Sequence, residues 1–257
     1  MPPIRKGDGT PVAPKGISQV RTGDGRILFD GVDIPDSVEY LYDADELVLS
    51  DGATVSTFNA IVGDVDFAED GSYNEPTFDE GGFNGQDAVY FNEGGEDNEQ
   101  LLADGFDVEE PFVVALAVEH VESTASNNFY FGHPDDRGDW QLQDDNNDNF
   151  EYARGTELED DDGAVQGAQI IRIDARSGDD RVIRDGTTVI KGDAGDENLD
   201  KMTMGGPGDR TDLSLECRWG KFLVADFESD SDLDSDDEID QLLDDWADQY
   251  ETPQGWS

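Results

Sequence analysis

Residues 168–190 read AQIIRIDARSGDDRVIRDGTTVI, and this stretch contains the pattern that decides the fold class. After a first apolar run, two β-branched pairs, Val182-Ile183 and Val189-Ile190, flank Asp185-Gly186. Asp-Gly between such runs is a strong β-hairpin signal, because both turn residues can adopt positive φ. Residues 213–219 (LSLECRW) then alternate between apolar and polar side chains, which predicts a strand with one buried and one wet face. We therefore predict an antiparallel all-β fold.

The remaining apolar runs extend this prediction along the chain. Residues 112–118 (FVVALAV) are apolar throughout, which is typical of a central strand covered on both faces. The single cysteine, Cys217, falls on the buried side of the alternating strand, where we expect a structural thiol. Polar, acidic stretches predict loops at 64–80, which contains Pro76, and at 143–149 and 157–163. We expect the other strands at residues 27–29, 38–42, 46–49, 88–91, 129–132, 140–142 and 222–227.

The charge balance is extreme. The 257 residues include 16 Lys and Arg against 64 Asp and Glu, a net charge of −48. A disordered acidic chain would be poor in aromatic residues, whereas this one has 13 Phe, 7 Tyr and 4 Trp, so we expect a folded domain with an acidic surface. Molar salt, which screens charges to about 3 Å, makes such self-repulsion tolerable. The composition favours a protein of a salt-loving archaeon or of a virus of one.

Several classes of function are disfavoured by the sequence. Binding to nucleic-acid phosphates is excluded by the charge. No run of about 18 apolar residues predicts a membrane span, and the first residues lack the apolar segment of a signal peptide. We therefore expect an extracellular role to depend on release by another route, such as inside a virion.

The first 35 residues differ in charge from the rest. IRKGDG at residues 4–9 recurs as VRTGDG at 20–25. Up to residue 26 there are five basic and two acidic residues, so this segment is net +3 and the remainder, −48 − 3, is net −51. The segment is either a flexible tail or a docking arm whose charge meets an acidic partner, and the repeat and the inverted charge favour docking. The basic residues of the arm are Arg5, Lys6, Lys15, Arg21 and Arg26.

The C-terminal segment changes from strand to helix periodicity. Ser235 followed by Glu238 predicts a capping box. One apolar face, made of Ile239, Leu242, Leu243, Trp246 and Tyr250, then predicts an amphipathic helix of about four turns that packs on the sandwich. We predict a basic docking arm at residues 1–35, a β-sandwich at 36–228, and a capped helix and tail at 229–257.

The order of these motifs resembles the concanavalin A-like, laminin-G-type jelly rolls. The resemblance covers roughly residues 36–250 and depends on the succession of motifs. It implies an antiparallel jelly-roll sandwich, to which the residues themselves add an extended N-terminal arm and one C-terminal amphipathic helix. In such families the domain often binds carbohydrates or surfaces, in secreted enzymes, adhesins and virion proteins. The motifs are GFNG (82–85) before AVYF (88–91), PFVVA (111–115), FYFG (129–132), QIIRI (169–173), RDGT (184–187), Leu199, Met202 and MGG (204–206).

With 64 Asp and Glu residues, the carboxylate patterns of catalytic and metal sites are expected to occur by chance. The glucanase branch of this superfamily carries Glu-x-Asp-x-x-Glu, and the near match at 238–240 lies on the predicted helix without the last Glu. We therefore expect no enzyme. Asp144, Asn146 and Asp148 have the one-three-five spacing of a calcium loop, but position twelve is Gly155. We expect no certain cofactor; calcium at these three residues is the candidate, and weakly held surface cations are the alternative.

A glycan-binding face would combine aromatic rings with amides and carboxylates on loops of the sandwich. Rings stack on sugars, and Asn and Asp hydrogen-bond sugar hydroxyls. The alternative for Tyr130 and Trp140 is a place in the core. The candidate residues are Tyr130, His133, Trp140, Asn146, Asn149 and Tyr152.

Together these observations predict a virion structural protein, such as a tail fibre, spike or capsid turret of a halophilic archaeal virus. We expect residues 1–35 to dock it onto other virion proteins, and the jelly roll to bind a host surface glycan in a high-salt, extracellular particle. A symmetric homo-oligomer is expected. The alternatives are a carbohydrate-binding module or glycoside hydrolase of a haloarchaeon, and a decoration protein without glycan binding.

Overall fold

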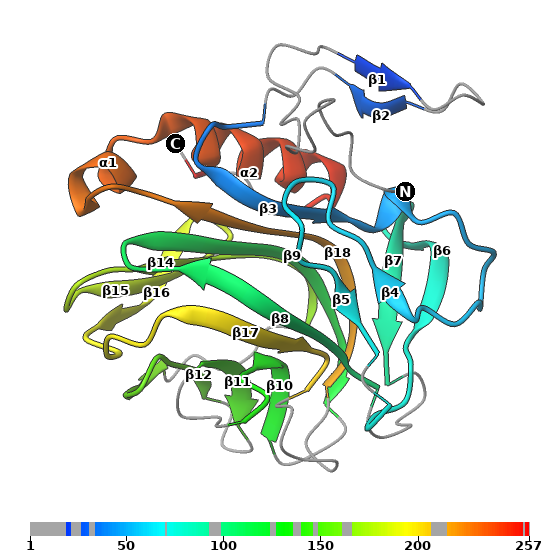
Figure 1. Ribbon diagram of the computed structural model, residues 1–257, viewed down its shortest axis with the longest axis horizontal. Coiled ribbons are helices and arrows are strands. Elements are labelled where there is room, and N and C mark those ends of the chain that lie inside the picture. Colours follow the sequence, from blue (N-terminus) through cyan, green and yellow to red (C-terminus); the bar gives the residue numbers. More distant parts are fainter. Residues whose placement is uncertain are drawn as a thin grey trace.

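Two antiparallel sheets stacked face to face form the body of the protein (Figure 1). The computed structural model describes residues 34–69, 71–92, 99–123, 127–135, 140–145, 149–160, 166–206, 215–253 and 255–256, and the backbone of 19–21 and 27–30; of 123, 127–128 and 144–145 only the backbone is described. Sheet 1 contains, in spatial order, β13 (Glu157–Asp160), β12 (Phe150–Ala153), β11 (Gln141–Asp145), β10 (Asn127–Gly132), β17 (Leu199–Met204), β8 (Leu101–Val108), β5 (Phe67–Ala68) and β4 (Thr57–Phe58).

Sheet 2 lies between sheet 1 and the helices. Its strands in spatial order are β16 (Thr187–Gly192), β15 (Asp180–Arg184), β14 (Gly167–Ala175), β9 (Phe112–Ser123), β18 (Leu215–Asp226), β7 (Gln86–Phe91) and β6 (Thr77–Phe83), with β3 (Val38–Asp43) also paired to β18. A separate pair joins β1 (Gln19–Arg21) to β2 (Ile27–Asp30). The remaining elements are the 3-10 turn η1 (Ala44–Glu46) and the helices α1 (Asp230–Asp234) and α2 (Asp237–Gln249). The predicted all-β sandwich with a C-terminal helix is confirmed.

The hairpin that decided the fold class forms where the sequence places it. β15 and β16 are joined at Asp185 and Gly186, which have φ of 47° and 75°. β14 pairs with β9 over nine residues, and β9 lies at the centre of sheet 2, as its apolar sequence predicts. One core fills the space between the two sheets, and a second fills the space between sheet 2 and the helices.

β18 is one continuous strand of 12 residues, whereas the sequence predicted two consecutive strands. Leu215, Cys217 and Trp219 point into the core between the sheets and have no exposed surface, as expected for the apolar half of an alternating strand. The face predicted to be wet is only partly so, because Glu216 is 7% exposed and hydrogen-bonded to the Tyr90 hydroxyl.

Helix α2 covers the outer face of sheet 2, and its predicted apolar face is buried there (Figure 1). The cap differs from the prediction. Asp236 is the N-cap and accepts hydrogen bonds from the amides of Glu238 and Ile239, whereas Ser235 ends α1. The predicted capping box was wrong because a short helix precedes α2 and uses Ser235 as its own C-cap.

Several local predictions of strands and loops were wrong. Residues 46–49 were expected to form a strand, but η1 ends at Glu46 and Val48 is 75% exposed. The expected acidic loops are partly strands, since β11 extends to Asp145 and β13 begins at Glu157. The acidic stretch 64–80 contains β5 and the start of β6. Pairing with a neighbouring strand can override local composition, which is why acidic segments joined the edge of sheet 1.

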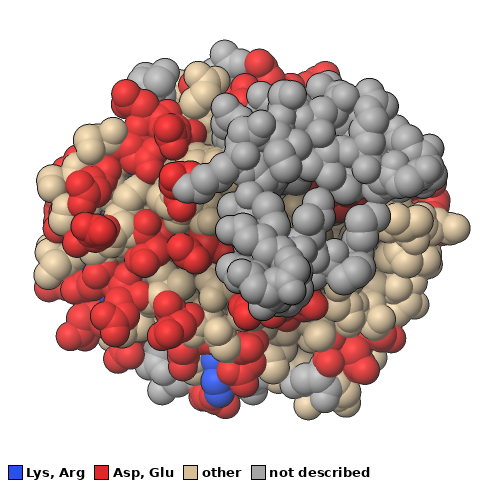
Figure 2. Space-filling view, turned by 45° about the horizontal axis from the view of Figure 1, so that its top comes forward, with Lys and Arg blue, Asp and Glu red and all other residues tan. Residues whose placement is uncertain are grey.

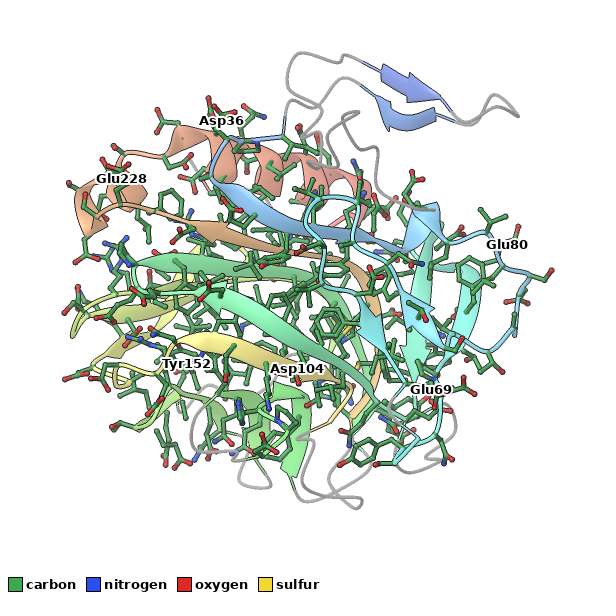
Figure 3. The ribbon with its side chains drawn as sticks, viewed as in Figure 1. Asp36, Glu69, Glu80, Asp104, Tyr152 and Glu228 are labelled. Atoms are coloured by element: carbon green, nitrogen blue, oxygen red, sulfur yellow. The ribbon has the colours of Figure 1, made fainter. Side chains whose placement is uncertain are left out.

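The acidic surface predicted from composition is present. Figure 2 shows Asp and Glu spread over much of the visible face, with little Lys or Arg between them. Asp36, Glu69, Glu80 and Glu228 lie at the periphery of the molecule (Figure 3).

Where carboxylates are crowded and buried, their charge opposes folding. Asp45, beside Asp43 and the amide of Asp87, is such a group: burial, followed by the charge of Asp43, raises its pKa to about 6.

We expect Asp45→Asn to stabilise the protein at neutral pH. The folded-state pKa of Asp45 exceeds its unfolded value, so its ionisation costs stability progressively as pH rises from about 4 through about 6. The variant should gain roughly 1–3 kcal/mol in free energy of unfolding at pH 7.5 and nothing at pH 4. Denaturant unfolding at both pH values in molar KCl measures this. An equal gain at both pH values would contradict the assignment to ionisation.

Candidate functional site

A groove of about 380 Å³ opens where β8 ends and β17 begins. The two strands are antiparallel neighbours, with Leu199 opposite Val108, so the segments that follow and precede them form facing walls. Every polar side chain of the walls except His133 is exposed. The groove is lined by Phe106, Asp107, Val108, Glu109, His133, Asp196, Glu197, Asn198, Leu199 and Asp200, and this lining includes five carboxylates and no Lys or Arg.

The wall before β17 is fixed in place by Arg154, a guanidinium with no exposed surface. Arg154 Nη1 donates to the backbone oxygen of Glu197 at 3.0 Å, so it holds the groove wall directly. Its Nη2 donates to Glu110 at 2.7 Å, and its Nε to Asp180 at 3.3 Å. Asp180 begins β15 of sheet 2 and Arg154 directly follows β12 of sheet 1, so this ion pair also ties the two sheets together.

The backbone of the same wall is tightly constrained. Ala194 donates its N–H to Asp180 at 2.9 Å and accepts from Arg154 at 3.2 Å and from Thr156 at 2.6 Å. Gly195 has φ of 111°, and a Cβ there would lie 2.0 Å from the Arg154 oxygen, so only glycine fits. The wall is therefore formed before any ligand arrives.

His133 is the one imidazole of the groove, and its tautomer follows from its partners. Nδ1 accepts a hydrogen bond from the backbone N–H of Asp135, with 3.2 Å between the two nitrogen atoms. Nε2 donates a hydrogen bond to Asp200 Oδ1 at 3.2 Å. Its backbone N–H donates to Trp140 at 2.7 Å. In the neutral ring the proton therefore sits on Nε2. His133 is 6% exposed, so it supports the groove edge through Asp200.

The predicted aromatic binding face is wrong. Tyr130, Trp140 and Tyr152 have no exposed surface and pack in the core between the sheets, where Trp140 contacts Tyr152 at 6.0 Å between ring centroids. A ring without exposed surface cannot stack on a sugar. Asn149 is half-buried beside β12 and donates to Glu159, and Asn146 lies outside the described residues. Of the six candidates, the structure places His133 alone in the groove.

The predicted calcium residues do not form a described cluster. Asp144 lies in β11, opposite Phe150 of β12, in a β-hairpin. Its side chain, Asn146 and Asp148 lie outside the described residues. Another group could hold a cation: carboxylate oxygens of Glu151, Glu157 and Glu159 lie within 4.8 Å of one another on adjacent strands β12 and β13. The sequence signal for it is Glu-x-Glu at 157–159, which puts two carboxylates on one face of a strand.

The docking arm is largely outside the described residues, which include only the backbone of β1 and β2 in this region. β2 agrees with the strand predicted at 27–29. Of the basic residues, Arg21 is in β1, and Arg5, Lys6, Lys15 and Arg26 are not described, so docking stays a prediction. No helix within the described ranges has the length and apolar character to cross a membrane.

Comparison with known proteins supports the fold. No protein-family model and no curated protein matches the sequence. The chain is similar to Trypanosoma rangeli sialidase in complex with sialic acid, with a TM-score of 0.55 and 11% identity over 89% of this chain and 36% of that one. It is also similar to the botulinum neurotoxin serotype D binding domain, with a TM-score of 0.51 and 12% identity over 81% of this chain and 52% of that one.

The chain thus spans only about a third to a half of the length of these two proteins. At 11–12% identity the likeness shows a β-sandwich fold and nothing of activity or ligand. Within that fold class, the resemblance to concanavalin A-like jelly rolls stays a prediction.

We expect Arg154→Met to destabilise the protein by about 3–5 kcal/mol, because the buried Asp180 carboxylate would lose its cationic partner. Arg181→Met, which removes a partly exposed guanidinium, should cost about 1 kcal/mol or less. Denaturant unfolding in molar KCl distinguishes the two. Equal costs for both variants would show that Arg154 does not fix the groove wall.

Proposed function

We propose that this chain is a glycan-binding β-sandwich module whose ligand lies in the groove between β8 and β17. The observation that carries the proposal is a preformed groove with hydrogen-bond acceptors on both walls, backed by a buried ion pair. Sugar hydroxyls are the donors that such acceptors bind. A fixed wall also lowers the conformational entropy lost when the ligand is ordered.

The charge of the groove restricts the class of glycan. Five carboxylates with no cation in the lining would repel a sugar that carries a carboxylate of its own, such as sialic acid. Neutral sugars avoid this repulsion, and amino sugars gain from the negative potential. The ligand is therefore a neutral or amino glycan, although one structural neighbour was solved with sialic acid. With the predicted aromatic rings in the core, recognition depends on hydrogen bonds.

The proposal is one of binding without hydrolysis. A hydrolase would need two of the groove carboxylates in distinct roles, one protonated as an acid and one ionised. Incubation of bound oligosaccharides with the protein in molar KCl, followed by analysis of chain length, tests this. Intact oligosaccharides support a binding module, and shortened ones favour the alternative of a glycoside hydrolase.

The double variant Asp107→Ala/Asn198→Ala removes one polar group from each wall of the groove. Loss of two hydrogen bonds, each worth about 0.5–1.5 kcal/mol, should weaken glycan binding by about tenfold or more. Isothermal titration calorimetry in molar KCl, with glycans first selected on an array of neutral, amino and sialylated chains, measures this.

The control is Glu228→Ala, which removes an exposed carboxylate at the periphery of the molecule (Figure 3). It should leave affinity unchanged. Binding that is indifferent to the groove variant would place the ligand elsewhere, and selective binding of sialylated chains would contradict the proposed class. No binding to any glycan would leave the decoration-protein alternative.

We further propose that the module belongs to a virion of a halophilic archaeal virus and docks there through residues 1–35. This assignment is supported by the acidic composition and the inverted charge of the arm, and therefore by the sequence alone. If the arm drives assembly, light scattering in molar salt should give an oligomer for the whole chain and a monomer after deletion of residues 1–35. Two monomers would exclude self-assembly through the arm.

A further inference from the structure

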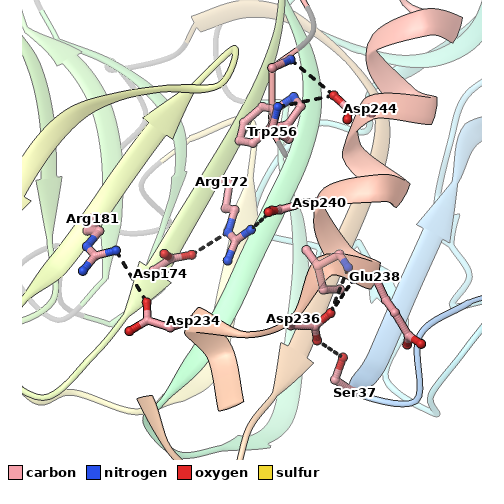
Figure 4. A network of polar contacts seen from close by, with 12 residues as sticks. Ser37, Arg172, Asp174, Arg181, Asp234, Asp236, Glu238, Asp240, Asp244 and Trp256 are labelled. Atoms are coloured by element: carbon pink, nitrogen blue, oxygen red, sulfur yellow. Dashed lines mark hydrogen bonds and ion pairs between the residues drawn. The ribbon is translucent and has the colours of Figure 1, made fainter. Parts of the chain in front are cut away.

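A second concavity, separate from the groove, lies between the helices and the outer face of sheet 2 (Figure 4). Its volume is about 190 Å³, roughly that of six water molecules in the liquid. Strands β14, β15 and β16 form one side, and α1, α2 and the segment at Trp256 form the other. It is lined by Arg172, Asp174, Arg176, Arg181, Ile183, Gly186, Thr188, Leu233, Asp234, Asp236, Asp240 and Trp256.

Most of the charged groups of this pocket pair with one another. Arg172 Nε lies 2.6 Å from Asp174, and its Nη1 binds Asp240 of α2. The Arg176 guanidinium forms two ion pairs, one with the same Asp174 at 3.2 Å and one with Asp234 of α1 at 2.8 Å. The lining thus contains three guanidiniums and four carboxylates, in contrast to the groove, which has five carboxylates and no Lys or Arg. In a chain with eleven Arg, three at one pocket form a marked local concentration.

Trp256 supplies an apolar wall. Its backbone N–H and that of Gly255 both donate to Asp244 Oδ1 of α2 at 3.3 Å. Gly255 fits closely over the β15–β16 turn, because a Cβ on Gly186 would lie 2.5 Å from its oxygen. The Trp256 side chain is 7% exposed, and its indole N–H has no partner in the described part of the chain. The buried Nε of Arg176 also lacks one.

We propose that this pocket binds a single neutral sugar ring. Hydroxyl groups both donate and accept, so they can add to the paired Arg and Asp groups without separating any pair. A ligand with net charge would have to break a buried pair, which is costly. The volume admits one ring and not a chain. The pocket does not depend on the groove being a glycan site. The two sites take different ligands, an oligosaccharide in the groove and a monosaccharide in the pocket.

The test fills the pocket without touching its ion pairs. Thr188 is exposed on β16 at the pocket, whereas its neighbour Thr187 is exposed on the same strand outside the lining. Saturation-transfer NMR in molar KCl, with glucose, galactose, mannose and arabinose each titrated to millimolar concentration, should detect binding to the wild type and to Thr187→Tyr. Thr188→Tyr should abolish it. Arg181→Gln, which removes one guanidinium and keeps Arg172 and Arg176, should weaken it several-fold.

The outcomes distinguish monosaccharide binding in the pocket from glycan binding in the groove. Monosaccharide binding that persists in the groove variant Asp107→Ala/Asn198→Ala and is lost in Thr188→Tyr supports the pocket. Binding that survives Thr188→Tyr, or that is lost in the groove variant alone, overturns it. Absence of monosaccharide binding to the wild type also overturns it, and shows the Arg and Asp network to be a clamp for the helices only. Matching thermal unfolding of the two Tyr variants excludes misfolding as the cause.

Discussion

The pairing of scarce cations with carboxylates is the interaction on which the rest of the structure depends. In the described part of the chain, at least eight Lys and Arg side chains form ion pairs with carboxylates, and Arg184 lies over the Phe150 ring. Several connect different layers: Arg154 connects the two sheets, and Arg172 and Arg176 connect sheet 2 to the helices. Removal of one partner would leave a buried charge uncompensated, so these few residues limit how the layers can separate.

The parts of the fold that were predictable from the sequence are those specified by local chemistry. The turn at Asp185-Gly186 needs two positive φ angles, and few other residue pairs provide them. The apolar run at 112–118 could only be a strand covered on both sides. The extents of β11 and β13 were not predictable in this way, because acidic residues disfavour a strand unless a neighbouring strand supplies hydrogen bonds. That neighbour is chosen by the whole fold and cannot be read from the segment itself.

The candidate functional site likewise depends on features that local sequence does not specify. Tyr130, Trp140 and Tyr152 were candidates for a glycan-binding face, with a core position as the alternative for Tyr130 and Trp140, because proximity to loops in sequence does not show which face of a strand a side chain occupies. The strand register does: Leu142 lies opposite Tyr152, so both point to the same face, and Leu142 marks that face as the core. The groove was missed because its walls, around residues 107 and 198, are brought together only by the pairing of β8 with β17.

The two concavities make opposite demands on the medium. In the groove, the lining offers the carboxylates no guanidinium or ammonium group, so solution cations must supply the compensating charge, and a ligand has to compete with them or share the site. In the pocket, arginines built into sheet 2 supply that charge at fixed positions, so removal of salt leaves its pairs in place. A protein of net charge −48 can keep a binding surface ordered in either way. In the pocket, ion pairs built into the fold hold the donors and acceptors in one arrangement, which is the condition for recognising a single small ring by its hydroxyl pattern.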